Sequence, residues 1–375
     1  MTLMLPAIPP SPRSITGVAH DLLGALDGRE GALPAARSVV LVVMDGLGAI
    51  PLRAHAGHAR RLAGAMAKKD VLSSVFPSTT AAALTSLLTG VDPGQHGLAG
   101  YEVRDPRTGA LVNQLAGWEK AGVDPAEWQR TPTVFETAAA AGRPAFAVGL
   151  GEHAGSGFST ATLRGAEFRS ARTAAERVAL AVSLAEEHDG SLVYCYLPEA
   201  DKAGHKRGMA SPEWVRALEE LDAAIPARVP GGVGLIVTAD HGMVDVPRSR
   251  HLILDEHSRL HDGVAAIAGE PRMLHVYLED AARVDEIAAE WAAGVAPAAD
   301  VVTKAQAIDG GLFGVVVTPE ARERIGDLVV PARGLWALYD GTADDQRSQG
   351  MIGQHGSLSP EELRVPLLRF GAFAP

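Results

Sequence analysis

Three aspartates follow apolar runs that have the composition of buried strands, and histidines stand close to two of them. Asp45 follows the first run. Asp201 and His205 lie four positions apart, so a single helical turn would place both side chains on one face, about 5–6 Å apart at Cβ. Asp240 and His241 are adjacent, so a loop behind the strand could direct them at different ions. Carboxylates and imidazoles of this kind bind divalent metals.

A further histidine, His355, lies far downstream in the glycine-flanked segment 353–356. Taken singly, each of these residues has a structural explanation, because Asp before Gly often forms a turn or a helix cap. Together they supply the oxygen and nitrogen ligands that zinc accepts, in sufficient number for a pair of ions with open positions. The set therefore predicts a site for two zinc ions, or for other divalent ions such as Mn²⁺.

A hydroxyl group that could act as a nucleophile lies in the segment 75–90. Pro77 breaks the preceding apolar run, and the Ala- and Leu-rich helix expected after it can be capped by Ser78, Thr79 or Thr80. A simple N-cap is one interpretation. The other is catalytic, because the free N–H groups of a helix N-terminus attract phosphate and a hydroxyl placed there can attack it. A threonine hydroxyl needs metal coordination to lower its pKa for this step.

The elements that must position these residues alternate between Val-, Ile- and Leu-rich runs and segments of helical period. This alternation predicts an α/β fold with a mostly parallel central sheet covered by helices on both faces. Ligands of such sheets bind beyond the carboxyl ends of the strands, where the aspartates stand. The predicted strands cover residues 38–44, 145–150, 191–197 and 234–238, and the predicted helices cover 80–88, 133–141, 173–188 and 212–224.

The pattern changes from about Ile253 to Tyr339. Residues 273–278 alternate like an antiparallel strand, residues 284–293 have a helical pattern, and glycines at 310–314 indicate turns. We expect a small α+β insertion over 253–339 within a single catalytic domain that spans residues 1–375.

The candidate residues belong to six short motifs that follow one another between about residues 38 and 356. The motifs are Val-Met-Asp45-Gly-Leu, Phe-Pro-Ser-Thr-Thr80, Pro93-Gly-Gln-His-Gly97, Asp201-Lys-Ala-Gly-His205-Lys, Thr238-Ala-Asp-His-Gly242 and Gly353-Gln-His-Gly356. In type, spacing and order they resemble the alkaline phosphatase superfamily, and most closely its nucleotide pyrophosphatase/phosphodiesterase branch. The resemblance implies an alkaline-phosphatase-like α/β/α sandwich and a metal-dependent hydrolase of phosphate esters.

The same resemblance implies a role for each candidate residue. Thr80 would attack phosphorus and form a phosphothreonine intermediate, because Thr80 matches the family's spacing to the Thr89-Gly90 and His96-Gly97 pairs; Thr79 is the alternative nucleophile. The ligands of one zinc would be Asp201, His205 and His355, and those of the other would be Asp45, Asp240 and His241, with Thr80 touching the second ion.

Two further residues are predicted to bind the substrate. The phosphodiesterase branch has an asparagine shortly after its His-Gly element, and this chain has Tyr101 there. A tyrosine hydroxyl could donate a similar hydrogen bond, and an ordinary half-buried aromatic residue is the other interpretation. Lys202, next to a predicted metal ligand, is the second candidate.

Several other activities are alternatives to a phosphodiesterase/nucleotide pyrophosphatase. A phosphomonoesterase or phosphonate hydrolase could share all six ligands and would need a cationic side chain, for which Arg104, Lys202 and Lys206 are candidates. Cys195 lies within an apolar run, which indicates a buried, inert thiol and disfavours a sulfatase. A non-catalytic metal-binding protein is disfavoured because no ligand is missing, and a dinucleotide-binding protein because Gly46-Leu-Gly48 is an incomplete glycine motif.

Composition sets the remaining expectations. The chain has 34 Lys and Arg against 45 Asp and Glu, a net charge of -11 and no long basic run, which disfavours a nucleic acid polymer as partner. A small phosphate ester or nucleotide is compatible, because bound divalent ions reverse the local field. With one cysteine, no intramolecular disulfide can form. The segment 1–13 lacks the pattern of a signal peptide and no run approaches ~18 apolar residues, so we expect a cytoplasmic protein without a membrane partner.

Overall fold

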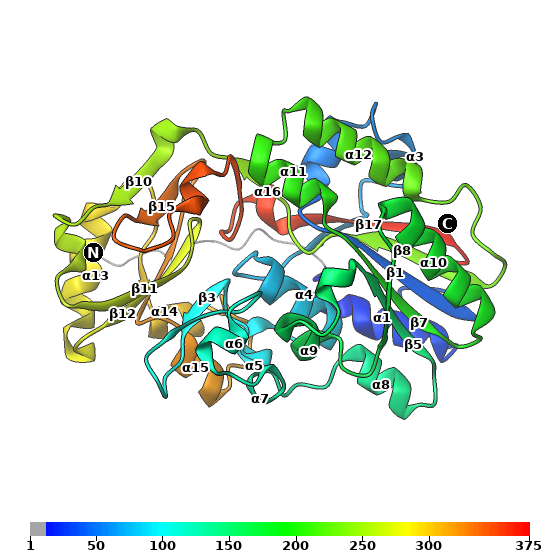
Figure 1. The fold of residues 1–375 in the computed structure, drawn as a ribbon, viewed down its shortest axis with the longest axis horizontal. Helices are drawn as coiled ribbons and strands as arrows, with labels where there is room; N and C mark the ends of the chain where they lie inside the picture. Colours follow the sequence, from blue (N-terminus) through cyan, green and yellow to red (C-terminus); the bar gives the residue numbers. More distant parts are fainter. Residues whose placement is uncertain (1–12) are drawn as a thin grey trace.

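A seven-stranded sheet forms the centre of the protein (Figure 1). The structure, a computed structural model, describes residues 13–375, so the proline-rich stretch 1–12 lies outside the described residues. The strand order is β2-β17-β8-β1-β7-β5-β6. The bounds are β1 (Ser38–Met44), β2 (Val71–Ser73), β5 (Ala145–Gly149), β6 (Glu167–Ser170), β7 (Leu192–Leu197), β8 (Val233–Thr238) and β17 (Arg364–Gly371).

Most neighbours in this sheet run parallel. Strand β1 is parallel to both β7 and β8, and β5 is parallel to β6 and β7, whereas β17 is antiparallel to β8 and β2. All seven residues of β1 are buried, as expected for a parallel strand whose two faces are both covered. The predicted mostly parallel sheet is therefore confirmed.

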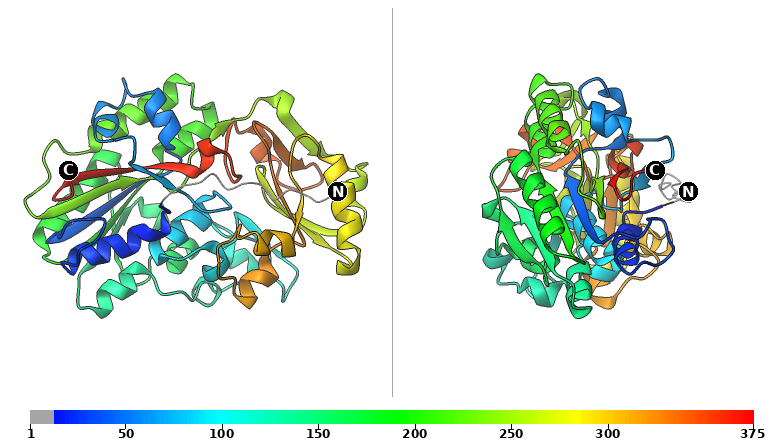
Figure 2. Two further views of the ribbon diagram at one scale, coloured as in Figure 1. Left: turned by 180° about the vertical axis from the view of Figure 1, so that it is seen from behind. Right: turned by 90° about the vertical axis from the view of Figure 1, so that its right-hand side faces the viewer.

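Helices cover both faces of the sheet (Figure 2). One layer contains α10, α11 and α12, and the other contains α1, α4 and α8. Two of these helices, α8 and α10, begin with complete capping boxes, Thr133 with Glu136 and Thr173 with Glu176, which explains where each helix starts. The bounds are α1 (Thr16–Leu26), α4 (Thr80–Thr89), α8 (Val134–Ala140), α10 (Ala174–Glu187), α11 (Glu199–Arg207) and α12 (Pro212–Ala224).

A second, antiparallel sheet lies beside the first and has its own apolar core around Trp291 (Figure 1). The strand expected over 273–278 and the helix expected over 284–293 are both present; the boundaries of an insertion over 253–339 stay a prediction. The elements of this part are β10 (His251–Leu254), β11 (Val264–Glu270), β12 (Met273–Leu278), α13 (Val284–Gly294), β13 (Val302–Thr303), α14 (Lys304–Asp309), α15 (Pro319–Arg324), β14 (Leu328–Pro331) and β15 (Ala337–Asp340).

The remaining helices and strands are short. Among residues 13–375, no helix has both the length and the apolar character that a membrane span requires. The short elements are α2 (Ala49–Ala54), α3 (Arg60–Gly64), α5 (Pro93–His96), β3 (Glu102–Arg104), β4 (Leu111–Asn113), α6 (Trp118–Ala121), α7 (Pro125–Trp128), α9 (Gly157–Thr162), β9 (Val244–Asp245), β16 (Gly353–Gln354) and α16 (Pro360–Leu363).

Candidate metal centre

The predicted metal ligands lie at the carboxyl ends of the central strands. Asp45 directly follows β1, Asp240 lies just beyond β8, and Asp201 is in the first turn of α11, the helix that follows β7. Because β1 pairs with both β7 and β8, these three strand ends are adjacent. Asp45, Asp240 and His241 are buried. The fold thus brings the acidic residues together, as the sequence predicts.

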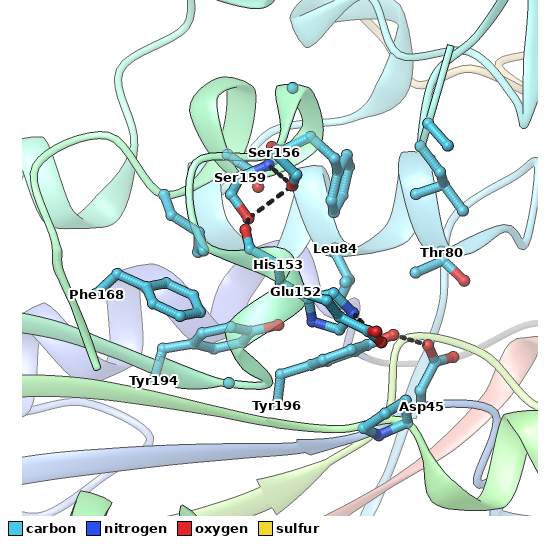
Figure 3. Close-up of a pocket in the computed structure, with 18 of the residues that line it drawn as sticks. Asp45, Thr80, Leu84, Glu152, His153, Ser156, Ser159, Phe168, Tyr194 and Tyr196 are labelled. Atoms are coloured by element: carbon cyan, nitrogen blue, oxygen red, sulfur yellow. Dashed lines mark hydrogen bonds and ion pairs between the residues drawn. The ribbon is translucent and has the colours of Figure 1, made fainter. Parts of the chain in front are cut away.

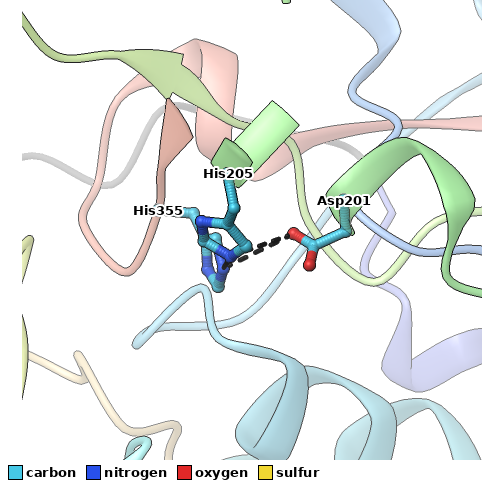
Figure 4. Close-up of side chains that lie close together, drawn as sticks. All are labelled: Asp201, His205 and His355. Atoms are coloured by element: carbon cyan, nitrogen blue, oxygen red, sulfur yellow. Dashed lines mark hydrogen bonds and ion pairs between the residues drawn. The ribbon is translucent and has the colours of Figure 1, made fainter. Parts of the chain in front are cut away.

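One group of candidate ligands consists of Asp201, His205 and His355 (Figure 4). Asp201 and His205 are one turn apart on α11, and Asp201 Oδ1 lies 3.3 Å from His205 Nε2 and 3.8 Å from His355 Nε2. The two Nε2 atoms are 3.3 Å apart. The loop after β16 therefore carries His355 to the same point as the helical pair.

Hydrogen bonds determine which nitrogen of each imidazole faces this group. His205 Nδ1 donates to the carbonyl of Gly353 at 2.8 Å, and His355 Nδ1 donates to the carbonyl of Ser78 at 2.9 Å. Because a carbonyl oxygen can only accept, each Nδ1 carries a proton, and in the neutral form of each ring the lone pair is at Nε2. Two such lone pairs beside a carboxylate oxygen repel one another unless a cation lies between them. Metal-binding histidines have this arrangement, with the second nitrogen held by the backbone.

His241 is the centre of the second group. Its Nδ1 donates to the carbonyl of the next residue at 2.9 Å, so Nε2 again presents a lone pair. This Nε2 lies 3.4 Å from both Asp45 Oδ1 and Asp240 Oδ2, and 3.1 Å from Thr80 Oγ1. Ligand atoms of Asp45, Asp201 and His241 all lie within 4.8 Å of one another, so Asp201 adjoins both groups.

Carboxylate oxygens that lack a hydrogen-bond partner indicate whether these two groups of side chains can bind cations. Within the described chain, Asp45 Oδ1, Asp201 Oδ1 and Asp240 Oδ2 are buried and accept no hydrogen bond. The other oxygen of Asp240 is satisfied, since it accepts from the N–H groups of Gly46 at 3.3 Å and His241 at 3.0 Å. A buried carboxylate oxygen without a partner is costly. The unpaired oxygens are also the ones that face the histidine nitrogens, so both groups fit divalent cations.

The ionisation of these side chains leads to the same conclusion. Without a cation, burial raises the pKa of Asp240 from its usual 3.8 to about 7, and the charge of Asp201 adds to the shift. Burial and the neighbouring Asp240 and Asp201 raise the pKa of Asp45 well above its usual value. Burial, with His241 and His205 nearby, lowers the pKa of His355 well below 6.5. Burial therefore favours the neutral form of His355, and the carboxylates of Asp45 and Asp240 need positive charge nearby in order to ionise.

The predicted nucleophile is the first residue of α4. Thr79 precedes it as the N-cap, and Thr79 Oγ1 accepts a hydrogen bond from the N–H of Ala82 at 3.3 Å. Thr80 Oγ1 instead lies beside His241 Nε2, and Thr80 lines a cavity at the site. The two neighbouring threonines thus have different surroundings, one in the helix cap and one among the candidate ligands.

Comparison with known proteins decides the family. Residues 39–358 match the family of type I phosphodiesterases / nucleotide pyrophosphatases. The chain belongs to this family. The predicted resemblance to the nucleotide pyrophosphatase/phosphodiesterase branch is thereby confirmed.

One curated relative of this phosphodiesterase family is an uncharacterized pyrophosphatase/phosphodiesterase of Schizosaccharomyces pombe, which is 27% identical over 231 residues. The match covers 58% of this chain and 47% of the yeast protein, so the chain spans about half the length of that relative.

Solved structures of ectonucleotide pyrophosphatase / phosphodiesterase 5 share the fold. An inactive form of the murine protein in complex with AMP has a TM-score of 0.68 at 19% identity, covering 90% of this chain and 88% of that chain. The human protein has a TM-score of 0.67 at 18% identity, covering 89% and 88%. These matches confirm the alkaline-phosphatase-like α/β architecture.

A cavity of about 540 Å³ opens beside Thr80 (Figure 3). Asp45, Thr80 and Asp201 lie at its metal-ligand end. The rest of its wall is largely apolar and aromatic, formed by Leu84, Leu115, Trp118, Val148, Phe158, Leu163, Phe168, Tyr194 and Tyr196, among others. A ligand bound here would present one end to Thr80 and bury an apolar or aromatic portion against the wall.

Tyr196 is a site residue that sequence reasoning missed. Its hydroxyl donates a hydrogen bond to Asp45 Oδ2 (Figure 3). This leaves Asp45 Oδ1 free to face His241. The Tyr196 ring stacks on that of Tyr194 at 6.4 Å between centroids and also lines the cavity. The alternation of Tyr194 and Tyr196 around Cys195 in β7 places both rings on one face of the strand, and this signal could have identified them.

The two predicted substrate-binding residues have different positions. Lys202 lines the cavity, and its Nζ lies 3.3 Å from Glu152 Oε1. Tyr101 does not line the cavity as described; it is 40% exposed, and its N–H donates to Glu270 Oε2 at 3.0 Å. A role for either residue stays a prediction.

Proposed function

We propose that this protein is a two-zinc phosphodiesterase or nucleotide pyrophosphatase in which Thr80 is the nucleophile. The observation that carries the proposal is the position of Thr80 Oγ1, which lies 3.1 Å from His241 Nε2, at the start of α4 and at the wall of the cavity. A phosphate held there would meet both the hydroxyl and the positive end of a helix.

The residues divide between two ions as the two groups suggest. Asp201, His205 and His355 would hold one ion, and Asp45, Asp240 and His241 would hold the other. When bound, such a pair lowers the pKa of an attacking hydroxyl and stabilises the leaving oxygen.

Thr80 and its surroundings carry out the covalent chemistry. Thr80 Oγ1 attacks phosphorus in line with the leaving group, the P–O bond to that group breaks, and a phosphothreonine ester forms; the proton lost from the threonine hydroxyl is balanced by the one that the departing alkoxide takes up to leave as the alcohol. Water then attacks the same phosphorus, the bond to Thr80 breaks, and the threonine hydroxyl is regenerated. Thr79 stays in the helix cap throughout, because its hydroxyl is already bonded to the backbone of α4.

The charge of the cavity favours a diester. Among the described residues that line it, Lys202 is the sole lysine or arginine, and its ammonium group already faces Glu152. Glu119 adds a further carboxylate to the wall. A monoester carries one more negative charge on its phosphate and would find no unpaired cation in this wall. We therefore expect phosphodiesters or nucleotide pyrophosphates, and the AMP complex of the murine relative supports a nucleotide as one half of the substrate.

A substrate panel tests this proposal. The zinc-loaded protein would be assayed as kcat/KM with an aryl phosphodiester, a nucleotide pyrophosphate and the matching aryl phosphomonoester, because this ratio reports discrimination in the transition state. We expect the diester or the pyrophosphate to be hydrolysed best. A preference for the monoester of tenfold or more, about 1.4 kcal/mol, would instead favour the phosphomonoesterase or phosphonate hydrolase alternative.

A further inference from the structure

A buried ion pair connects the second sheet to the metal-ligand loops. Arg272 lies in the turn between β11 and β12, and neither its side chain nor that of Glu362, in α16, is exposed. Arg272 Nε donates to Glu362 Oε1 at 3.1 Å and Nη2 donates to Glu362 Oε2 at 2.6 Å, so the contact is bidentate. Arg272 Nη1 donates to the carbonyl of Gly334 at 2.8 Å, which fixes the guanidinium in the part of the fold that contains the second sheet.

The carboxylate of Glu362 extends this connection to the loop that carries His355. Glu362 Oε1 accepts a hydrogen bond from the N–H of Ser357, two residues after His355, at 2.9 Å. Ser357 Oγ donates to the carbonyl of Ala332 at 2.6 Å, which is a second link to the same part of the fold. The chain on the carboxyl side of His355 is therefore held by groups that belong to the second sheet and α16.

The backbone of Glu362 holds the His241 loop as well. The N–H of Gly242 donates to the carbonyl of Glu362 at 2.7 Å, and the carbonyl of Gly242 accepts from His241 Nδ1 at 2.9 Å. A Cβ at Gly242 would lie 2.0 Å from the carbonyl oxygen of Glu361, so this approach requires glycine. Glu362 in α16 thus accepts hydrogen bonds from backbone groups close to two histidine ligands, Ser357 near His355 and Gly242 beside His241.

Ser78 completes the connection at the nucleophile. Its hydroxyl donates to the carbonyl of Ser357 at 2.7 Å, and its own carbonyl accepts from His355 Nδ1 at 2.9 Å. Ser78 stands two residues before Thr80. The Arg272–Glu362 pair, the His355 loop and the start of α4 therefore form one continuous hydrogen-bonded chain.

We propose that Arg272 and Glu362 are positioning residues that hold His355, and through α16 His241, in the geometry that binds metal. This inference rests on the proposed two-zinc function. A buried ion pair contributes little net stability, because the cost of desolvating two charges offsets their attraction, whereas its fixed bidentate geometry can hold an orientation. The second sheet is then a support for the metal centre.

Zinc affinity measured on folded variants tests the proposal. The double variant Arg272→Met/Glu362→Met removes both charges together, so no unpaired charge remains buried. Arg272→Lys keeps the charge but loses the bidentate contact. The control is Arg324→Met, because Arg324 is also a buried arginine in this part of the fold, and it donates to the carbonyls of Gly97 and Trp128 at 3.0 Å rather than to a metal-ligand loop. Each metal-free protein would be checked by thermal unfolding and then titrated with zinc against a chromophoric chelator.

We expect the double variant to bind the His355 ion about 10–100-fold more weakly, the usual effect of losing a partner that orients a ligand. Arg272→Lys should weaken the same ion by a smaller factor, and Arg324→Met should bind zinc like the wild type even if it unfolds at a lower temperature. Wild-type zinc affinity in the folded double variant would overturn the proposal. If the double variant does not fold, wild-type affinity in Arg272→Lys would overturn it. A wild-type chain that binds no zinc would remove the proposed function itself, and this inference with it.

Discussion

Replacing Thr80 and Thr79 separately by alanine distinguishes the nucleophile from its neighbour. Thr79→Ala removes the oxygen that accepts from the N–H of Ala82, and loss of such a cap costs about 1 kcal/mol of unfolding free energy. In the metal-free chain, Thr80→Ala removes the hydroxyl that lies 3.1 Å from His241 Nε2, a buried hydrogen bond that is also worth about 1 kcal/mol. The two variants should therefore be destabilised to a similar extent. Their turnover should differ, because only Thr80 can form the covalent ester.

The assay measures kcat on the best diester of the panel with zinc-saturated protein, alongside urea unfolding of each variant. Thr80→Ala should lose several orders of magnitude in kcat with its zinc content nearly unchanged, whereas Thr79→Ala should stay within a small factor of wild type. Thr80→Ser should keep part of the activity, because the attacking hydroxyl remains while its χ1 is less restricted. A folded, zinc-loaded Thr80→Ala protein with near-normal kcat, beside an inactive Thr79→Ala protein, would show that Thr79 is the nucleophile.

Three further predictions concern the ligands. His355→Ala should lose chiefly one of two zinc ions, since the other ion keeps Asp45, Asp240 and His241 as ligands. Metal analysis after dialysis would show this loss. If the variant does not fold, His355 has a structural role instead. Tyr196→Phe should weaken zinc binding about tenfold, because it removes the hydroxyl that holds Asp45 Oδ2. Tyr194→Phe changes a tyrosine of the same cavity wall and should leave zinc affinity unchanged. Equal zinc affinities of the two variants in a titration would rule out a role for the Tyr196 hydroxyl. The pKa of Asp240 is raised to about 7 in the metal-free chain and that of Asp45 is also raised, so zinc must displace protons below that pH. Apparent zinc affinity should therefore rise with pH up to about 7, by roughly tenfold per unit for each proton displaced. A zinc affinity that does not change between about pH 5.5 and 7 would contradict this last prediction.

Local patterns predict the central part of this protein well. The buried strand β1 is a continuous apolar run that matches its predicted bounds, and Asp45 follows it directly. Asp201 and His205 share a helix face because their spacing of four residues is that of one turn. The position of Thr80 at the start of α4 was also predictable, because Pro77 interrupts the preceding run and an Ala-rich segment follows it. Each of these features depends on residues that are close together in the sequence.

Features that depend on distant pairs were not predictable from these patterns. The hydrogen bond between Tyr196 and Asp45 joins residues 151 apart, and the contact between Arg272 and Glu362 joins residues 90 apart. Nothing in the spacing of either pair signals a contact, because both arise only when strands and loops assemble. Tyr101 was suggested by its position after the His-Gly element; it is not among the residues that line the cavity, and its contact with substrate stays a prediction.

Some expectations remain predictions. Cytoplasmic residence and the limits of the 253–339 insertion depend on features that the fold and the family do not address. The identity of the metal is also a proposal, although the donors, carboxylate oxygens with imidazole Nε2 atoms, are those that zinc accepts.

The central claim is that two zinc ions occupy the groups around His355 and His241. Metal analysis of the protein after zinc loading and gentle dialysis tests it most directly. The account predicts close to two zinc ions per chain, together with loss of diester hydrolysis when a chelator removes them. A stoichiometry near zero, with full hydrolysis retained in the presence of the chelator, would contradict it.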